Sequence, residues 1–199
     1  MEKIKVDNLS FSYPSSDKLA LDSVSLSIPE SEFVVLCGKS GCGKSTLLRH
    51  LKKSMNPYGN KFGSVCFDGE EIEEMSDKDA ASKIGYVQQN PDNQLVTDKV
   101  WHELAFGLES LGYSNSVIKR RVAEMASYFG IQTWFRKSVS ELSGGQKQLL
   151  NLASVMAMQP EVLILDEPAS QLDPIAARDF LSTVHRLNRE LGVTIIISE

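Results

Sequence analysis

The chain has 199 residues, of which 42% are hydrophobic and 24% are charged, and its formal net charge is −5. This is the composition of an ordinary globular protein with room for a sizeable core, and the negative charge argues against binding nucleic acid or an anionic membrane through a basic surface. No apolar run approaches the roughly 18–20 residues that span a bilayer, and the first residues lack the apolar core of a signal peptide.

The first third of the chain is predicted to be rich in β-strands. Apolar or alternating runs separated by turn residues predict strands at 4–6, 19–28, 33–37, 65–67 and 84–87. A helix is expected from Ser45 to about Lys53. The three cysteines, Cys37, Cys42 and Cys66, cannot all pair and show no metal-ligand spacing, which favours a reducing cytoplasm. We interpret Cys42, within a glycine-rich loop, as a small side chain rather than a catalytic thiol.

The middle of the chain has helical periodicity instead. Helices are predicted at 100–111, 114–129, 132–139 and 143–158, and after Pro160 come a buried strand at 162–165, a helix at 174–191 and a strand at 193–197. Strand–helix–strand order at both ends, with a helical block between, predicts a single α/β domain over residues 1–199. Its core is expected at about 1–88 and 150–199, and an inserted helical subdomain at about 89–149.

A glycine-rich loop follows the predicted strand at 33–37. It reads Gly38, Lys39, Ser40, Gly41, Cys42, Gly43, Lys44 and Ser45, which fits G-x-x-x-x-G-K-[ST] with a strand before it and a helix after it. Such a loop points successive backbone N–H groups and a helix N-terminus at polyphosphate. We predict that these residues and Thr46 bind ATP, that Lys44 reaches the β- and γ-phosphates, and that Ser45 ligates Mg²⁺. The alternative is a strand–helix turn without a ligand.

Two acids, Asp166 and Glu167, end the apolar run at 162–165. Ligands of open α/β sheets bind at the carboxyl ends of the strands. We predict that Asp166 holds Mg²⁺ through water and that Glu167 is the general base for the water that attacks the γ-phosphate. Without the glycine-rich loop, a pair that simply caps the next turn would be the better interpretation.

A second motif, Leu142, Ser143, Gly144, Gly145 and Gln146, stands at the start of the helix predicted at 143–158. One nucleotide does not need two phosphate-binding helix ends, so this second end is expected to serve a nucleotide held by a partner. Here the sequence resembles the ATP-binding cassette family, whose signature is LSGGQ. The resemblance implies a second cassette, identical, distinct or fused, and two ATP molecules sandwiched between the pair.

The resemblance extends over essentially the whole chain and assigns further residues. It implies that Tyr13 stacks on adenine, that Gln89 contacts Mg²⁺ and the attacking water, and that Ser170 and Asp173 lie in the loop that couples the two sites. Packing is the alternative for Tyr13. The implied fold is a P-loop NTPase core with a mostly parallel sheet, an N-terminal antiparallel β subdomain and an inserted α-helical subdomain.

One family element has no counterpart. In the family a histidine follows the last strand and touches the γ-phosphate, and none of His50, His102 and His185 stands at that position. We therefore expect the chain to be a C-terminally incomplete cassette that binds nucleotide better than it hydrolyses it. We expect His50 and His185, on predicted helices, to be surface or packing residues.

The run Asn90-Pro91-Asp92-Asn93-Gln94, with 100–109 after it, resembles the ATPases of energy-coupling factor importers for vitamins, thiamine precursors and cobalt or nickel. It implies a transmembrane partner that contacts the region around Gln89–Gln94 at the cytoplasmic face of the membrane. The alternatives are an ordinary ABC solute importer, a cassette of DNA repair or chromosome structure, and a nucleotide-gated module without turnover. Long coiled coils, which the second of these would require, are missing from the sequence.

Overall fold

The computed structural model describes every residue except 1, 15 and 17, and within the described residues the strands form two sheets. The N-terminal sheet is antiparallel, with the order β2-β1-β4-β5, and its strands are β1 (Glu2–Ser12), β2 (Leu21–Pro29), β4 (Asn60–Phe67) and β5 (Glu70–Glu71). In β1 the apolar side chains of Ile4, Val6, Leu9 and Phe11 are buried, while polar neighbours such as Lys5 face solvent. One buried and one solvated face is what an antiparallel sheet at the rim of a domain requires.

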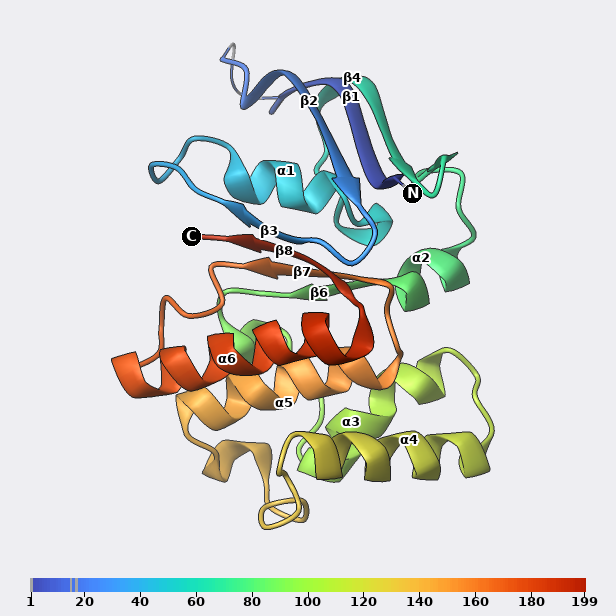
Figure 1. Ribbon diagram of the computed structural model, residues 1–199, viewed down its shortest axis with the longest axis vertical. Helices are drawn as coiled ribbons and strands as arrows, with labels where there is room; N and C mark the ends of the chain where they lie inside the picture. Colours follow the sequence, from blue (N-terminus) through green and yellow to red (C-terminus); the bar gives the residue numbers. More distant parts are fainter. Residues whose placement is uncertain (1, 15, 17) are drawn as a thin grey trace.

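The second sheet is parallel and lies at the centre of the molecule (Figure 1). Its order is β3-β8-β7-β6, and its strands are β3 (Phe33–Leu36), β8 (Thr194–Ser198), β7 (Val162–Asp166) and β6 (Ile84–Val87). All residues of β6, β7 and β8 are buried, which explains why these strands appear in the sequence as nearly unbroken apolar runs. Their carboxyl ends meet at one edge, the left edge in Figure 1.

Helices cover both faces of the parallel sheet (Figure 1). Helix α1 (Lys44–His50) lies between the two sheets, and α5 (Gly144–Ala157) and α6 (Pro174–Leu191) lie on the opposite face. Helices α3 (Val100–Ser110) and α4 (Asn115–Tyr128) pack against α5 and form the outermost layer. Short helices complete the chain: α2 (Asp77–Lys83), η1 (Lys53–Met55), η2 (Pro91–Asn93) and η3 (Val139–Glu141).

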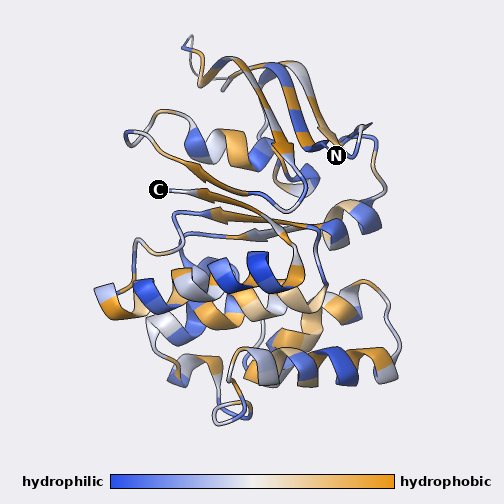
Figure 2. Ribbon diagram, in the orientation of Figure 1, coloured by the Kyte–Doolittle hydropathy of each residue, from blue (hydrophilic) through white to orange (hydrophobic). Residues whose placement is uncertain are grey.

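Two apolar clusters hold these layers together, one on each face of the parallel sheet. Side chains alternate along β7, so that Ile164 joins the cluster beneath the N-terminal sheet while Leu163 and Leu165 join the cluster of the helices. Figure 2 shows the apolar colour concentrated on the parallel strands and on the inward sides of the helices. Burial of each such side chain stabilises the fold by about 1.5–3 kcal/mol relative to exposure. The central sheet is therefore a stable support for the residues at its edge.

The predicted fold class is confirmed, but one predicted element is wrong. Of the residues 132–139, the first five form turns, Lys137 a bend and Ser138 an isolated bridge, and Val139 already begins η3, so no α-helix forms there. The backbone N–H of Val139 donates to the Asp98 carbonyl, and Lys99 and Ser138 form an isolated antiparallel bridge. Pairing with the segment that precedes α3 therefore competes successfully with helical hydrogen bonding here.

Helix α2 was not predicted from the sequence. It has only one buried residue, Ala80, so its seven residues show no apolar periodicity. The available signal was at its start, where the Ser76 hydroxyl caps the helix by accepting from the Asp79 N–H. A serine followed three residues later by an acid is the pattern that could have identified it.

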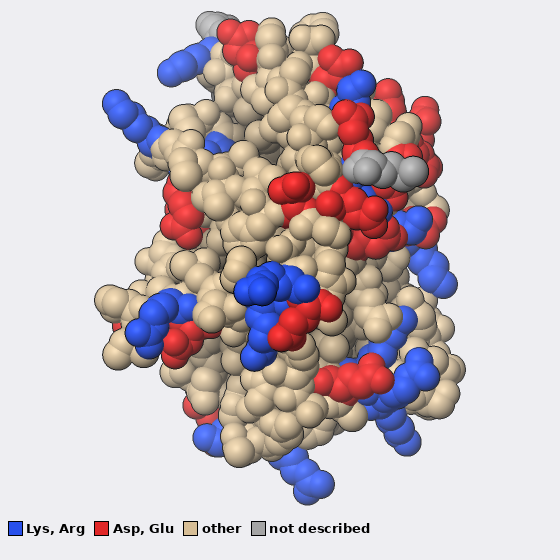
Figure 3. Space-filling view, viewed as in Figure 1, with Lys and Arg blue, Asp and Glu red and all other residues tan. Residues whose placement is uncertain are grey.

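The surface carries charges of both signs. On the face shown in Figure 3, acidic side chains gather in the upper right, at the level of the N-terminal sheet, while lysines and arginines are scattered. Among the helices that the structure describes, none combines the length and the apolarity that a membrane crossing needs.

Candidate nucleotide-binding site

The glycine-rich loop connects β3 to α1 at the edge where the parallel strands end. Residues Gly38 to Cys42 are exposed, and the first helical residue is Lys44. The Lys44 side chain folds back so that its Nζ donates to the Gly38 carbonyl at 2.8 Å. The loop thus surrounds an ammonium group and the N-terminus of a helix, both of which attract anions.

Gly43 is the residue that the loop geometry demands most strictly. Its φ is 102°, and a Cβ at this position would lie 2.5 Å from the Ala20 carbonyl oxygen. Gly41 has a φ of 78°, but a Cβ there would meet no atom within 4 Å. Both positions therefore have a backbone conformation that is unfavourable for any residue other than glycine. Only Gly43 is also packed closely, against the connection between β1 and β2.

We expect Gly43→Ala to destabilise the chain more than Gly41→Ala, its matched control. The control carries only the cost of a left-handed conformation, about 1–2 kcal/mol, while Gly43→Ala adds the clash with the Ala20 carbonyl. Urea unfolding of the two variants beside the parent chain measures the difference. Equal losses in the free energy of unfolding would contradict the packing argument.

Asp166 is the last residue of β7 and is buried, with 8% of its surface exposed. Its Oδ1 accepts hydrogen bonds from the Ser45 and Ser198 hydroxyls, each at 2.9 Å, and its Oδ2 accepts one from the Tyr86 hydroxyl at 3.1 Å. Burial, followed by the neighbouring Asp166 charge, raises the pKa of Tyr86, so the phenol stays protonated as a donor. The predicted partners Ser45 and Asp166 are in direct contact.

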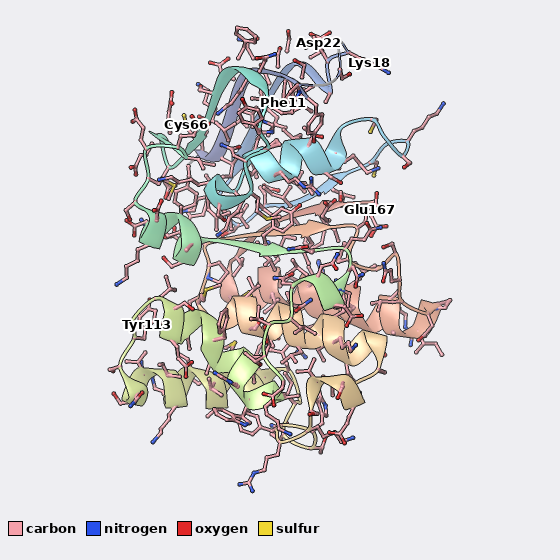
Figure 4. The ribbon with its side chains drawn as sticks, turned by 180° about the vertical axis from the view of Figure 1, so that it is seen from behind. Phe11, Lys18, Asp22, Cys66, Tyr113 and Glu167 are labelled. Carbon is pink, nitrogen blue, oxygen red and sulfur yellow. The ribbon has the colours of Figure 1, made fainter. Side chains whose placement is uncertain are left out.

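Glu167 follows Asp166 with a φ of 43°, a left-handed conformation that is uncommon outside glycine. Its backbone N–H donates to the Ser198 hydroxyl at 3.0 Å, which fixes the turn after β7. Its Oε1 lies 3.6 Å from Lys44 Nζ, and its Oε2 accepts from the Gln89 amide at 3.1 Å. Backbone strain of this kind is typical of functional sites, because the surrounding structure must enforce it. Figure 4 shows Glu167 at the edge where the strands end.

Gln89 lies just beyond β6, and its amide reaches two predicted site residues. Besides Glu167, it donates to the Ser170 hydroxyl at 3.2 Å, and Ser170 in turn donates to the Glu167 carbonyl at 2.8 Å. The structure therefore brings Lys44, Glu167, Gln89 and Ser170 into one connected group beside the Ser45–Asp166 pair.

The donor set suits Mg²⁺ bound together with a polyphosphate. Mg²⁺ prefers oxygen ligands and usually takes only one or two protein groups, with phosphates and water as the others. Ser45 and Asp166 offer a hydroxyl and a carboxylate in contact with each other, next to the anion-attracting loop. Within the described part of the chain, no group of three His, Cys, Asp or Glu side chains forms an all-protein metal site.

Tyr13 lies beside the loop helix. Its hydroxyl is 3.1 Å from Thr46 Oγ1, and its ring packs edge-on against Phe11 at 4.9 Å between centroids. The prediction that Tyr13 stacks on adenine remains a prediction. His50, which we expected to be a surface or a packing residue, packs: it is buried with its ring 4.7 Å from that of Phe11, and burial lowers its pKa.

The second motif lies at the start of α5, and the parallel sheet separates this helix from the loop helix α1 (Figure 1). Leu142 is buried, and Ser143 caps α5 by accepting from the Gln146 N–H, while the Gln146 side chain accepts from the Ser143 N–H. Ser143 and Gly144 are exposed. Asp173 likewise caps α6, accepting from the N–H groups of Ile175 and Ala176. The exposed N-terminus of α5 and the loop helix α1 of the same chain therefore lie on opposite faces of the parallel sheet.

The sequence prediction missed two residues that contact Asp166 and a third that contacts the chain neighbours of Gln89 and Glu167. Tyr86 and Ser198 both bind Asp166, and Gln148, fully buried, donates to the carbonyls of Gln88 and Pro168. Tyr86 and Ser198 are polar residues in otherwise apolar strands, and that position near the strand end was the available signal. Gln148 stands two residues after the second motif, where helical spacing alone does not show which face it occupies.

Comparisons with known proteins agree with this geometry. A family model described as ABC transporter matches residues 21–170. A putative ABC transporter ATP-binding protein of Bacillus thuringiensis subsp. konkukian is 51% identical over 195 residues, which cover 98% of this chain and 35% of that protein. The energy-coupling factor transporter ATP-binding protein EcfA1 of Latilactobacillus sakei subsp. sakei is 39% identical over 97% of this chain and 68% of its own length. The chain spans about a third of the length of the first of these relatives.

Solved structures give the same answer. CbiO1 of Clostridium perfringens, described as part of the ABC transporter complex cbiONQ, is 33% identical with a TM-score of 0.87, over 100% of this chain and 78% of its own. The cassette MJ0796, in a dimeric post-hydrolysis state with ADP and Pi, is 25% identical with a TM-score of 0.81, over 98% of this chain and 87% of its own. Since the family model spans the glycine-rich loop, the second motif and both acids at the end of β7, the chain belongs to the ABC transporter family as one of its ATP-binding cassettes.

Proposed function

We propose that the chain binds Mg-ATP at the glycine-rich loop and hydrolyses it to drive a membrane importer of the energy-coupling factor type. The observation that supports this most directly is the connected group at the strand ends, where Ser45 meets Asp166 and Lys44 and Gln89 meet Glu167. Each member has the chemistry that phosphoryl transfer to water needs, and all of them surround one loop.

The scheme assigns the residues of the site to three tasks: binding the nucleotide, holding Mg²⁺ and activating the water. Lys44 and the N–H groups of Gly38–Ser45, with Thr46, hold the triphosphate, and Tyr13 stacks on the base. Ser45, Asp166 and Gln89 would hold Mg²⁺, which would supply positive charge against the phosphates. Gln89 orients the water and Glu167 accepts its proton, a step for which the two side chains already stand in contact at 3.1 Å.

A second cassette completes each site in this proposal. Leu142–Gln146 cannot serve the nucleotide of its own chain, because the parallel sheet separates it from α1 (Figure 1). Its exposed Ser143 and Gly144 suit a phosphate that arrives on another chain, and a Cβ at Gly144 would meet no atom within 4 Å. Ser170 contacts Gln89, and Asp173 lies three residues farther on, so the two are placed to connect the site to the docked cassette.

The transmembrane partner is proposed to dock near Gln89–Gln94. The Gln94 side chain accepts from the Gln88 N–H and donates to the Tyr86 carbonyl, which ties this loop to β6. Gln94 also lines a groove of about 300 Å³ between α3 and the core, together with the exposed apolar side chains of Val96 and Phe106. An apolar segment of a membrane protein fits such a groove, and a cassette docked there lies at the cytoplasmic membrane face.

The energy-coupling factor type is favoured over an ordinary ABC solute importer by the run Asn90–Gln94 and by the likeness to EcfA1 and CbiO1. Affinity purification of the complete protein from gently solubilised membranes tests the choice. Recovery of a small substrate-capture membrane protein is expected. Recovery of a transporter that works with a periplasmic binding protein would refute the energy-coupling type and leave the ATPase proposal intact.

A further inference from the structure

We propose that Tyr86 is a positioning residue for Asp166, and that its hydroxyl holds the carboxylate in the orientation that serves Mg²⁺. The inference rests on the proposed binding of Mg-ATP and goes beyond it, since neither the glycine-rich loop nor the second motif includes Tyr86. The Tyr86 hydroxyl donates to Asp166 Oδ2 at 3.1 Å, and both residues are buried, with 7% and 8% of their surfaces exposed.

The two carboxylate oxygens of Asp166 have different partners. Oδ1 accepts from Ser45, the first hydroxyl of the loop helix, and from Ser198 on β8, each at 2.9 Å, whereas Oδ2 accepts from Tyr86. Rotation of an aspartate carboxylate about its last torsion is soft, so donors on one oxygen leave its plane poorly fixed. A donor on the second oxygen fixes the plane and keeps Oδ1 directed at Ser45.

The position of Tyr86 in the sheet explains how it reaches that oxygen. Tyr86 pairs with Ile164 on β7, two residues before Asp166, and its ring lies in the apolar cluster beneath the N-terminal sheet. The backbone of this strand end is held from the other side by Gln94, whose amide donates to the Tyr86 carbonyl at 2.9 Å. A phenylalanine would fill the same apolar space, so Tyr86→Phe removes only the contacts of the hydroxyl, which are its bond to Asp166 and its interaction with the neighbouring Arg49.

Comparing Tyr86→Phe with the parent chain in two titrations separates positioning from packing. The affinity for ATP is measured by calorimetry with Mg²⁺ in excess and again with EDTA. Loss of one hydrogen bond, worth about 0.5–1.5 kcal/mol, predicts that the Kd for Mg-ATP rises about two- to tenfold, while the Kd measured with EDTA stays the same. Urea unfolding of the same samples reports any general loss of stability.

Tyr113→Phe is the matched control. Tyr113 lies in the helical layer far from Glu167 (Figure 4), its ring faces the Arg121 guanidinium, and phenylalanine keeps that ring. Both of its affinities should equal those of the parent chain. Equal changes with Mg²⁺ and with EDTA in Tyr86→Phe, or no change in either, would overturn the positioning role. If the parent chain itself bound ATP equally with Mg²⁺ and with EDTA, the proposed Mg-ATP site would fail, and the role of Tyr86 with it.

Discussion

Lys44→Ala is expected to abolish tight Mg-ATP binding. The Lys44 side chain is only 8% exposed, and its Nζ lies between the Gly38 carbonyl at 2.8 Å and Glu167 Oε1 at 3.6 Å. In the proposed complex this ammonium group exchanges those contacts for the β- and γ-phosphates. A hydrogen bond to a charged group contributes about 1.5–3 kcal/mol, so losing contacts to two phosphates should weaken binding on the order of a hundredfold or more.

The measurement is a calorimetric or fluorescence titration of Lys44→Ala with Mg-ATP, with Lys119→Ala as the control. Lys119 is exposed on α4, in the outer helical layer, so its removal changes the net charge by the same amount without touching the loop. The control should bind within about twofold of the parent chain, because exposed charges a Debye length or more away are largely screened. If Lys44→Ala bound Mg-ATP as tightly as the parent chain, the assignment of phosphate binding to the glycine-rich loop would be wrong.

Four residues of the group at the strand ends belong to contiguous sequence patterns and could be predicted from them, whereas Gln89 and Ser170 were assigned only from the family resemblance. Lys44 and Ser45 lie in a motif with fixed spacing, and Asp166 and Glu167 end an apolar run, so strand order alone places them together. Their contact across 121 residues, from Ser45 to Asp166, follows from the parallel pairing of β7 and β8 next to β3.

What the sequence could not predict depends on contacts between elements. Residues 132–139 have helical spacing, yet pairing of Lys99 with Ser138 draws them out of a helix. Tyr86 and Ser198 donate hydrogen bonds to Asp166 from the two strands that flank β7. The spacing of these residues along the chain does not reveal that their side chains meet there. Local patterns therefore identify the motif residues, while the residues that orient them emerge only from the register of the sheet.

In the complete protein, Glu167→Gln is expected to keep Mg-ATP binding and to lose turnover by about a hundredfold or more. Glutamine has the shape of glutamate and retains an oxygen that can accept from Gln89, but it cannot take a proton from water. Binding should stay within a few-fold of the parent value, because the phosphate-binding contacts of Lys44 and the loop remain. Phosphate release under saturating Mg-ATP, measured beside the binding titration, separates the two effects.

In the complete protein, a cassette that binds but does not hydrolyse should accumulate in the closed, two-cassette state. Light scattering or cross-linking with Mg-ATP detects that state, and Glu124→Gln, an exposed acid on α4, is the control that should still turn over and reopen. Unchanged hydrolysis in Glu167→Gln would show that Glu167 is not the general base. Gln89 has no group that takes a proton at neutral pH, and Asp166 already accepts three hydroxyl hydrogen bonds, so the proton would then have to pass to the γ-phosphate itself.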